Sequence, residues 1–169
     1  ERPEETGYLY FPIAGERGLK SAITPLLGGD AKTDQNHFLM QPVSEQELHN
    51  NRNTRNFWCR VEGKGVWSAA GSSAEETVKR MTGQGEESRL TAGFMWHQMD
   101  RKSEEFGLSS QILSFVPADE NVEIMKVSIT NIGTENATFT GYGVFPIYGR
   151  SADNLRDHRH VTSLLHRIK

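Results

Sequence analysis

Apolar and polar residues alternate most regularly in the second half of the chain. From Val122 to Asn131 the apolar positions recur with a period of two, with one slip at Met125-Lys126, which is typical of an antiparallel strand with one buried face. Three further runs have a similar strand-like composition: Gly93–Lys102, Phe106–Val116 and Thr138–Tyr148. Because short turns separate the four runs, the pattern predicts a meander of long strands in an all-β sandwich.

A β-hairpin is predicted between Asn53 and Ala70, where two short strand-like runs flank Gly63-Lys64-Gly65. Gly63-Lys64 suits a two-residue type II′ turn, which favours glycine at its first central position. The resulting pairs are Val61 with Val66, Cys59 with Ser68 and Phe57 with Ala70. A type I turn with Gly65 as a bulge fits nearly as well and shifts every pair by one residue.

In the first of these registers, the outer face of the hairpin carries Trp58, Arg60 and Trp67, with Arg60 opposite Trp67. Flat aromatic rings stack on the apolar faces of pyranose rings, so these three residues form a candidate sugar platform. Large aromatic residues in a sandwich more often pack in the core or at its edge, and packing is the interpretation that we favour.

The first half of the chain gives weaker patterns. Short strands are predicted at Tyr8–Ile13, Ser21–Leu27 and His37–Met40, with a turn at Gly28-Gly29-Asp30. Ser73-Ala74-Glu75-Glu76 has the sequence of a helix capping box, but the region from Gly71 to Gly85 has little apolar periodicity. We therefore expect a surface excursion there with short helical turns at most.

Composition limits the function classes. A chain of 169 residues is expected to form one domain, residues 1–169. No apolar run approaches the length of a membrane span, and a net charge of −3 gives no footprint for nucleic acid, so neither partner is expected. The polar N-terminal stretch Glu1–Glu5 does not resemble a secretory signal, and the single cysteine, Cys59, fits a reducing compartment, so we expect a cytoplasmic protein.

The stretch from Tyr148 to Val161 is the most polar in the second half of the chain. His158 and His160 have the spacing of two ligands on one strand, with His166 as a third, but no established metal motif supports them, and no metal is expected. The apolar positions from Val161 to Ile168 follow a helical spacing over eight residues, where a strand also remains open.

Several motifs resemble the N-terminal domain of the inverting disaccharide phosphorylases of glycoside hydrolase family 94, which act on cellobiose, laminaribiose, chitobiose or β-1,2-oligoglucans. The matching segments are Ile23-Thr24-Pro25, Gly28-Gly29-Asp30, the hairpin from Asn53 to Trp67, Ala92-Gly93-Phe94 and, most specifically, Pro146 to Val161. The resemblance implies an antiparallel β-supersandwich like galactose mutarotase, at the N-terminal end of a longer enzyme.

The resemblance also implies a function. The parent enzyme is expected to be a glycosyltransferase of carbohydrate metabolism that cleaves a β-linked gluco-disaccharide or oligosaccharide with inorganic phosphate as co-substrate and no other cofactor. Its catalytic Asp lies in a separate barrel, so residues 1–169 hold no catalytic residue.

In the family this domain contributes to a homodimer, and a loop of it reaches the acceptor side of the partner's active site. The matching loop is 149–160, with Arg156, Asp157, Arg159 and His160 as the acceptor-side residues. The alternative function is a stand-alone carbohydrate-binding module that uses Trp58 and Trp67, and a third is a complete mutarotase-like epimerase.

Overall fold

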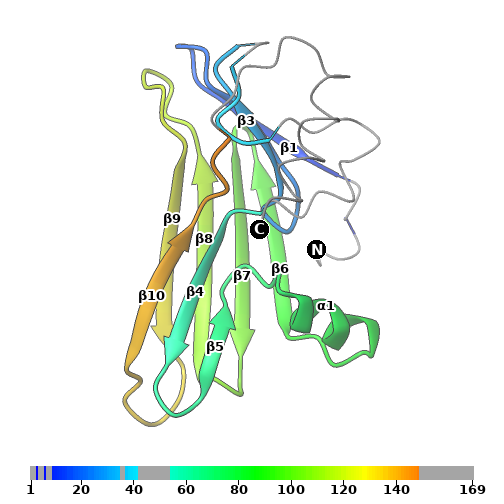
Figure 1. Cartoon of the computed structure of the whole chain (residues 1–169), viewed down its shortest axis with the longest axis vertical. Helices are drawn as coiled ribbons and strands as arrows, with labels where there is room; N and C mark the ends of the chain where they lie inside the picture. The colour runs from blue at the N-terminus through cyan, green and yellow to red at the C-terminus, as the bar shows by residue number, and fades with distance from the viewer. Residues whose placement is uncertain (1–2, 4–5, 7–8, 35–36, 42–53, 149–169) are drawn as a thin grey trace.

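A computed structural model describes residues 3, 6, 9–34, 37–41 and 54–148 of the chain (Figure 1). In this part of the chain, strands β1 to β10 form three antiparallel sheets, and the one helix, α1, lies beside them. The predicted all-β sandwich is confirmed. Its two layers are a long meander at the back and shorter sheets at the front (Figure 1).

The back layer is a four-stranded meander in the order β6-β7-β8-β9. Its strands are β6 (Glu87–Gly93), β7 (Trp96–Ser103), β8 (Leu108–Phe115) and β9 (Ile124–Asn131). β7 and β8 alternate buried and more exposed residues along their whole length, which is the burial pattern of strands with one face on a core. Three of the four predicted runs therefore form the meander as expected.

The fourth predicted run, Thr138–Tyr148, supplies β10 (Phe139–Val144) but leaves the meander. β10 pairs antiparallel with β4 (Asn56–Val61), whose other neighbour is β5 (Gly65–Ser68). This sheet lies in front of the meander (Figure 1). The Ser110 hydroxyl on β8 donates a hydrogen bond of 3.0 Å to the Ala69 carbonyl, which ties the two layers together.

The hairpin from β4 to β5 exists, but its predicted type II′ register is wrong. Val61 pairs with Gly65 and Cys59 pairs with Trp67, which is the register shifted by one residue. Gly63 and Gly65 both adopt positive φ angles, of 72° and 113°, so the turn takes three residues instead of two. A shift of one residue exchanges the two faces of a strand, so Trp67 faces the core instead of solvent.

A third sheet, β1-β2-β3, covers the end of the meander where β7 begins (Figure 1). Its strands are β1 (Phe11–Ala14), β2 (Lys20–Ile23) and β3 (Gly29–Lys32). The predicted turn at Gly28-Gly29-Asp30 instead begins β3, because the chain already reverses between Thr24 and Gly28. The predicted strand His37–Met40 is wrong in extent: among the described residues, His37 and Phe38 form isolated bridges, that of Phe38 to Lys32, and Leu39 and Met40 form no strand.

Helix α1 (Ala74–Met81) begins at the predicted capping sequence. The Ser73 hydroxyl accepts a hydrogen bond of 3.0 Å from the Glu76 backbone N–H, as an N-cap does. Acidic residues in the first turn and basic residues in the last turn match the helix dipole. The predicted surface excursion is therefore a helix of two turns, which the capping sequence indicated and the weak apolar periodicity concealed.

One hydrophobic core cluster joins all three sheets in the described part of the chain. Its buried members are Ile13, Leu19, Ile23, Leu27, Cys59, Val61, Trp67, Ala69, Ala70, Met99, Phe106, Leu108, Ile112 and Val116. A buried arginine, Arg55, supplements this core. Its guanidinium pairs with Glu123, with 2.9 Å between Nη2 and Oε2, and donates to the carbonyls of Gly28 and Asp30. Arg55 thus joins the small sheet, the start of β4 and the approach to β9.

Candidate functional site

Trp67 is a core residue and forms no part of a sugar platform. Its side chain is 2% exposed, and its indole N–H donates a hydrogen bond of 2.9 Å to Glu86. Its ring also lies 6.4 Å, centroid to centroid, from that of Phe106. The predicted platform of Trp58, Arg60 and Trp67 is therefore wrong for Trp67, which has the packing role that the sequence favoured.

Trp58 and Arg60 do lie together on the outer face of the front sheet. In the pairing of β4 with β10, Trp58 is opposite Tyr142 and Arg60 is opposite Thr140. Trp58 is half-buried, and Tyr142 is 48% exposed. Directly opposed residues of antiparallel strands place their side chains next to each other on one face. The aromatic neighbour of Trp58 on this face is thus Tyr142, which sequence reasoning missed.

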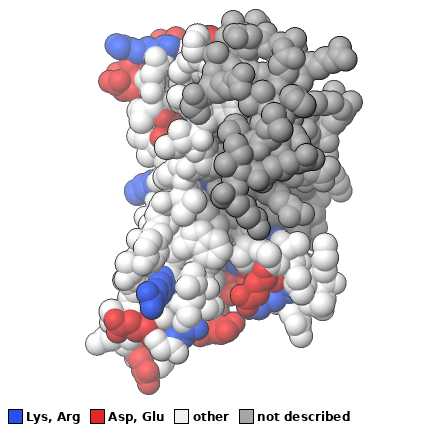
Figure 2. Space-filling view, viewed as in Figure 1, with Lys and Arg blue, Asp and Glu red and all other residues white. Residues whose placement is uncertain are grey.

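A cavity of about 400 Å³ adjoins Trp58 at the start of β4. Its lining residues are Thr54, Asn56, Trp58, Ser72, Ser73, Ala74, Val144 and Pro146. None of them carries a charge. On this side of the molecule, the charged residues gather at the upper and lower ends and beside α1 (Figure 2). The lining combines one large aromatic ring with hydroxyl and amide groups, which is the composition of a site for a neutral, polar small molecule.

Hydrogen bonds fix the polar wall of this cavity. The Asn56 side-chain amide donates to the hydroxyls of Ser68 and Ser72, both at 3.0 Å, and its oxygen accepts from the Phe57 backbone N–H at 2.8 Å. The hydroxyls of Thr54 and Ser72 lie 3.2 Å apart. Because each hydroxyl has one donor and two acceptor positions, Thr54 and Ser72 keep capacity for a ligand while their positions are held.

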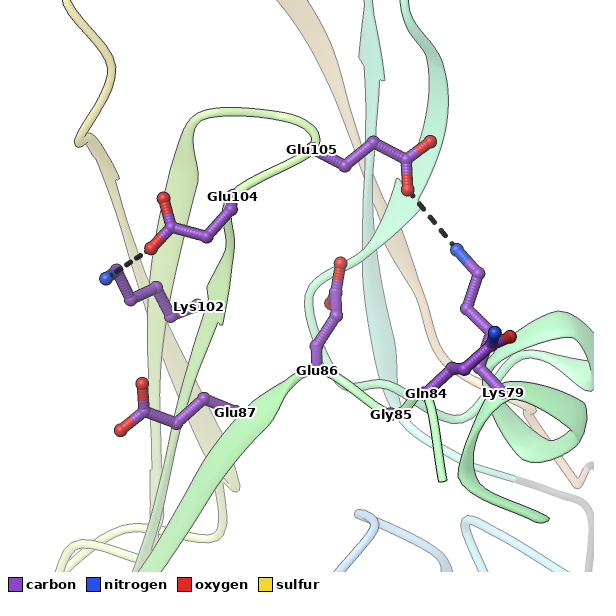
Figure 3. Close-up of a pocket in the computed structure, with 8 residues that line it drawn as sticks. All are labelled: Lys79, Gln84, Gly85, Glu86, Glu87, Lys102, Glu104 and Glu105. Carbon is purple, nitrogen blue, oxygen red and sulfur yellow. Dashed lines mark hydrogen bonds and ion pairs between the residues drawn. The ribbon is translucent and has the colours of Figure 1, made fainter. Parts of the chain in front are cut away.

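A second cavity, of about 350 Å³, lies between α1 and the turn after β7 (Figure 3). It is lined by Lys79, Gln84, Gly85, Glu86, Glu87, Lys102, Glu104 and Glu105. Figure 3 shows both lysines paired, Lys79 with Glu105 at 3.4 Å and Lys102 with Glu104. A hydrogen bond to Glu75 raises the pKa of Lys79, and one to Glu104 raises that of Lys102. Opposite charges that neutralise each other in this way are typical of a structural surface network.

Glu86, which lines the same cavity, is likewise part of a structural ion-pair network. It pairs with Arg101 of β7, which holds Glu76 of α1 at 2.9 Å. The Arg101 side chain is 3% exposed and packs where a Cβ on Gly71 would fall, so glycine is required at that position. This network anchors α1 against the sandwich and positions Ser72 and Ser73 at the edge of the uncharged cavity.

Two reactive side chains lie in the interior. Burial raises the pKa of the Cys59 thiol to about 11, so Cys59 is a protonated core residue and is not poised as a nucleophile. His97 on β7 is fully buried, and burial together with the nearby Arg55 charge lowers its pKa to about 4. Within the described residues, neither ring nitrogen of His97 has a hydrogen-bond partner, and no carboxylate engages it as an acid–base pair would require.

The acceptor-side residues Arg156, Asp157, Arg159 and His160 lie outside the described residues, as does the whole loop 149–160. The histidines His158 and His166 and the segment Val161–Ile168 also fall there. Among the residues that the structure does describe, no group of three or more His, Cys, Asp or Glu side chains is placed to hold a metal ion. The one described helix, α1, is much too short and polar to cross a membrane.

The comparisons with known proteins identify the family. A model of the domain described as "Glycosyl hydrolase 94, supersandwich domain" matches residues 32–167. No curated protein sequence matches the chain. The family match includes all strands of the β10-β4-β5 sheet and of the β6-β7-β8-β9 meander, as well as the residues of loop 149–160. Because the match covers well over half of the chain, the protein belongs to the glycosyl hydrolase 94 family and carries its supersandwich domain.

Proposed function

We propose that this chain is the non-catalytic N-terminal domain of an inverting β-glucoside phosphorylase, in which it supplies a subunit interface and an acceptor-side loop. The observation that carries the proposal is the family match over residues 32–167, which includes the motif shared with disaccharide phosphorylases, Pro146 to Val161. The parent enzyme would transfer a glucosyl group from a β-linked gluco-disaccharide to inorganic phosphate. Its catalytic Asp belongs to a separate barrel.

The base of the proposed loop is well anchored. Tyr148, the last described residue, is 9% exposed and packs with Phe38. Its backbone N–H donates a hydrogen bond of 2.8 Å to the Leu39 carbonyl. The chain is therefore fixed to the fold at the residue that immediately precedes the proposed loop, which supports a defined starting point for it.

The residues just before this anchor support an interface. Phe145 is 50% exposed and Ile147 is 86% exposed, although both are large and apolar. Exposed apolar side chains next to a segment that reaches toward a partner are typical of a surface that the partner covers. We infer that Phe145 and Ile147 lie at the subunit contact of the parent homodimer.

The loop has suitable chemistry for the acceptor side. Arg159 carries a planar guanidinium with five donors, and His160 donates or accepts at its two ring nitrogens. Sugar hydroxyls both accept and donate hydrogen bonds. Together with Arg156 and Asp157, these side chains would orient the acceptor sugar for attack on the sugar 1-phosphate in the synthetic direction.

Steady-state kinetics of the full-length enzyme test this role. In Arg159→Ala and His160→Ala, kcat/KM for the acceptor should fall about ten- to a hundredfold, because one charged hydrogen bond contributes roughly 1.5–3 kcal/mol. The constants for the sugar 1-phosphate donor should change less. Arg89→Ala, on the exposed side of β6, is the matched control. Wild-type acceptor kinetics in both loop variants would refute the acceptor-side role.

A further inference from the structure

We propose that the outer face of the β4–β10 pair, together with the cavity beside Trp58, is a binding site for a β-linked gluco-oligosaccharide. All residues of this site belong to the described part of the chain, and none of them comes from loop 149–160. It consists of the aromatic pair Trp58 and Tyr142 and the polar cavity wall of Thr54, Asn56 and Ser72. The choice of a β-glucoside rests on the proposed function, whereas the site itself rests on the geometry of the described residues.

The aromatic pair accounts for the stacking surface. Trp58 and Tyr142 are cross-strand neighbours on one sheet face, so both contribute aromatic surface to that face, and Val144 follows on the same face two residues further along β10. A β-glucopyranose unit carries its substituents in equatorial positions and therefore presents C–H groups on both flat faces of the ring. Such a face packs against an aromatic ring and removes the apolar surface of both from water.

The cavity accounts for the polar contacts. Its volume of about 400 Å³ lies in the range of small-molecule sites. With no charged residue in the lining, the cavity fits a neutral ligand and disfavours a free phosphate or a sugar phosphate. The Thr54 and Ser72 hydroxyls are held by each other and by Asn56, so they can exchange hydrogen bonds with sugar hydroxyls without first being ordered.

The arrangement also indicates the path that an oligosaccharide chain would follow across the sheet. The cavity touches Trp58 on the side of the β4 start, while Tyr142 lies on the neighbouring strand. One sugar unit would occupy the cavity against Trp58, and the next unit would lie over Tyr142. The site should therefore bind a linear oligosaccharide more tightly than glucose itself.

Isothermal titration calorimetry of the 169-residue protein with cellotetraose, laminaritetraose and, as an α-linked comparison, maltotetraose tests the site. We expect a micromolar to millimolar dissociation constant for at least one β-linked tetraose and weaker binding of maltotetraose. Trp58→Ala and Tyr142→Ala should each weaken binding about tenfold or more, and Ser72→Ala should weaken it less. Phe94→Ala, at a position 88% exposed in the β6–β7 turn, is the matched aromatic control.

Three results would overturn the proposal: no heat of binding up to roughly 10 mM sugar, wild-type affinity in both aromatic variants, or an equal loss in Phe94→Ala. Tyr142→Ala changes an exposed residue, so it tests the site even where Trp58→Ala fails to fold. Binding needs no phosphate and no partner subunit. Sugar binding together with unchanged acceptor kinetics in both Arg159→Ala and His160→Ala would leave this site standing and remove the loop role.

Discussion

Acidification should destabilise this protein through one buried side chain, His97. The imidazole lies inside the sandwich, opposite Ser114 on β8 and with its ring centroid 5.3 Å from that of Phe11. Burial, and then the Arg55 charge, lower its pKa to about 4. Arg55, whose charge contributes to this shift, is itself paired with Glu123.

The sign of the effect follows from the two states. An unfolded histidine has a pKa of about 6.5, so between pH 6.5 and 4 the unfolded chain binds a proton that the folded protein excludes. The contribution of His97 is therefore fully present above pH 6.5 and is lost as the pH falls through this window. At about 1.4 kcal/mol for each pKa unit, the loss amounts to about 2–3 kcal/mol at pH 4.5.

Urea unfolding of the wild type and His97→Asn between pH 7.5 and 4.5 measures this loss. Carboxylates titrate in both proteins, so the difference between the two pH profiles isolates His97. The wild type should lose about 2–3 kcal/mol more than the variant over this range. Parallel profiles for the wild type and His97→Asn would show that His97 is not held neutral by the fold.

Three further outcomes follow from the structure and the family. Glu123→Gln leaves the buried Arg55 without its counter-charge, so the free energy of unfolding in urea should fall by about 3–5 kcal/mol, whereas Glu135→Gln at an exposed position should not change it. Trp67→Ala removes a core side chain and should cost about 3–5 kcal/mol in the same assay, and a loss under about 1 kcal/mol would contradict its burial. Residues 1–169 alone should release no sugar 1-phosphate from cellobiose, laminaribiose or sophorose with phosphate, and detectable turnover would mean that this domain holds catalytic groups.

The sequence alone predicted the back sheet well, because its strands are long and their turns are short. Alternation repeated over eight residues leaves little freedom in which face is buried, as in the segment from Val122 to Asn131. Of β6, the sequence pattern predicted only the last residue, Gly93. The first residues, Glu87-Ser88-Arg89, are polar, and they form a strand because they pair with β7. The local sequence pattern predicts a strand well where the strand buries one full face. It predicts a strand poorly where pairing with neighbouring strands determines whether the segment is extended.

The front sheet was predicted less well, for two physical reasons. The glycines at 63 and 65 each permit a different turn, and the choice of turn fixes which face Trp67 occupies. The pairing of β10 with β4 joins distant segments, which no local pattern encodes. Because of this turn and this pairing, the aromatic neighbour of Trp58 on the outer face is Tyr142 and not Trp67. The candidate acceptor-side residues remain a prediction from the motif that ends at Val161.

The pairing of β4 with β10 has a consequence for synthesis on the ribosome. Val61 pairs with Phe139, and 78 positions separate them in the sequence. At about 5–20 residues per second, the β4–β5 hairpin leaves the ribosome roughly 4–16 s before the strand that completes its sheet. During that interval the β4 edge has unpaired backbone groups, which can recruit strands of neighbouring nascent chains. Chaperones that hold exposed strand edges should therefore act on chains whose synthesis has passed β5 but has not yet reached β10.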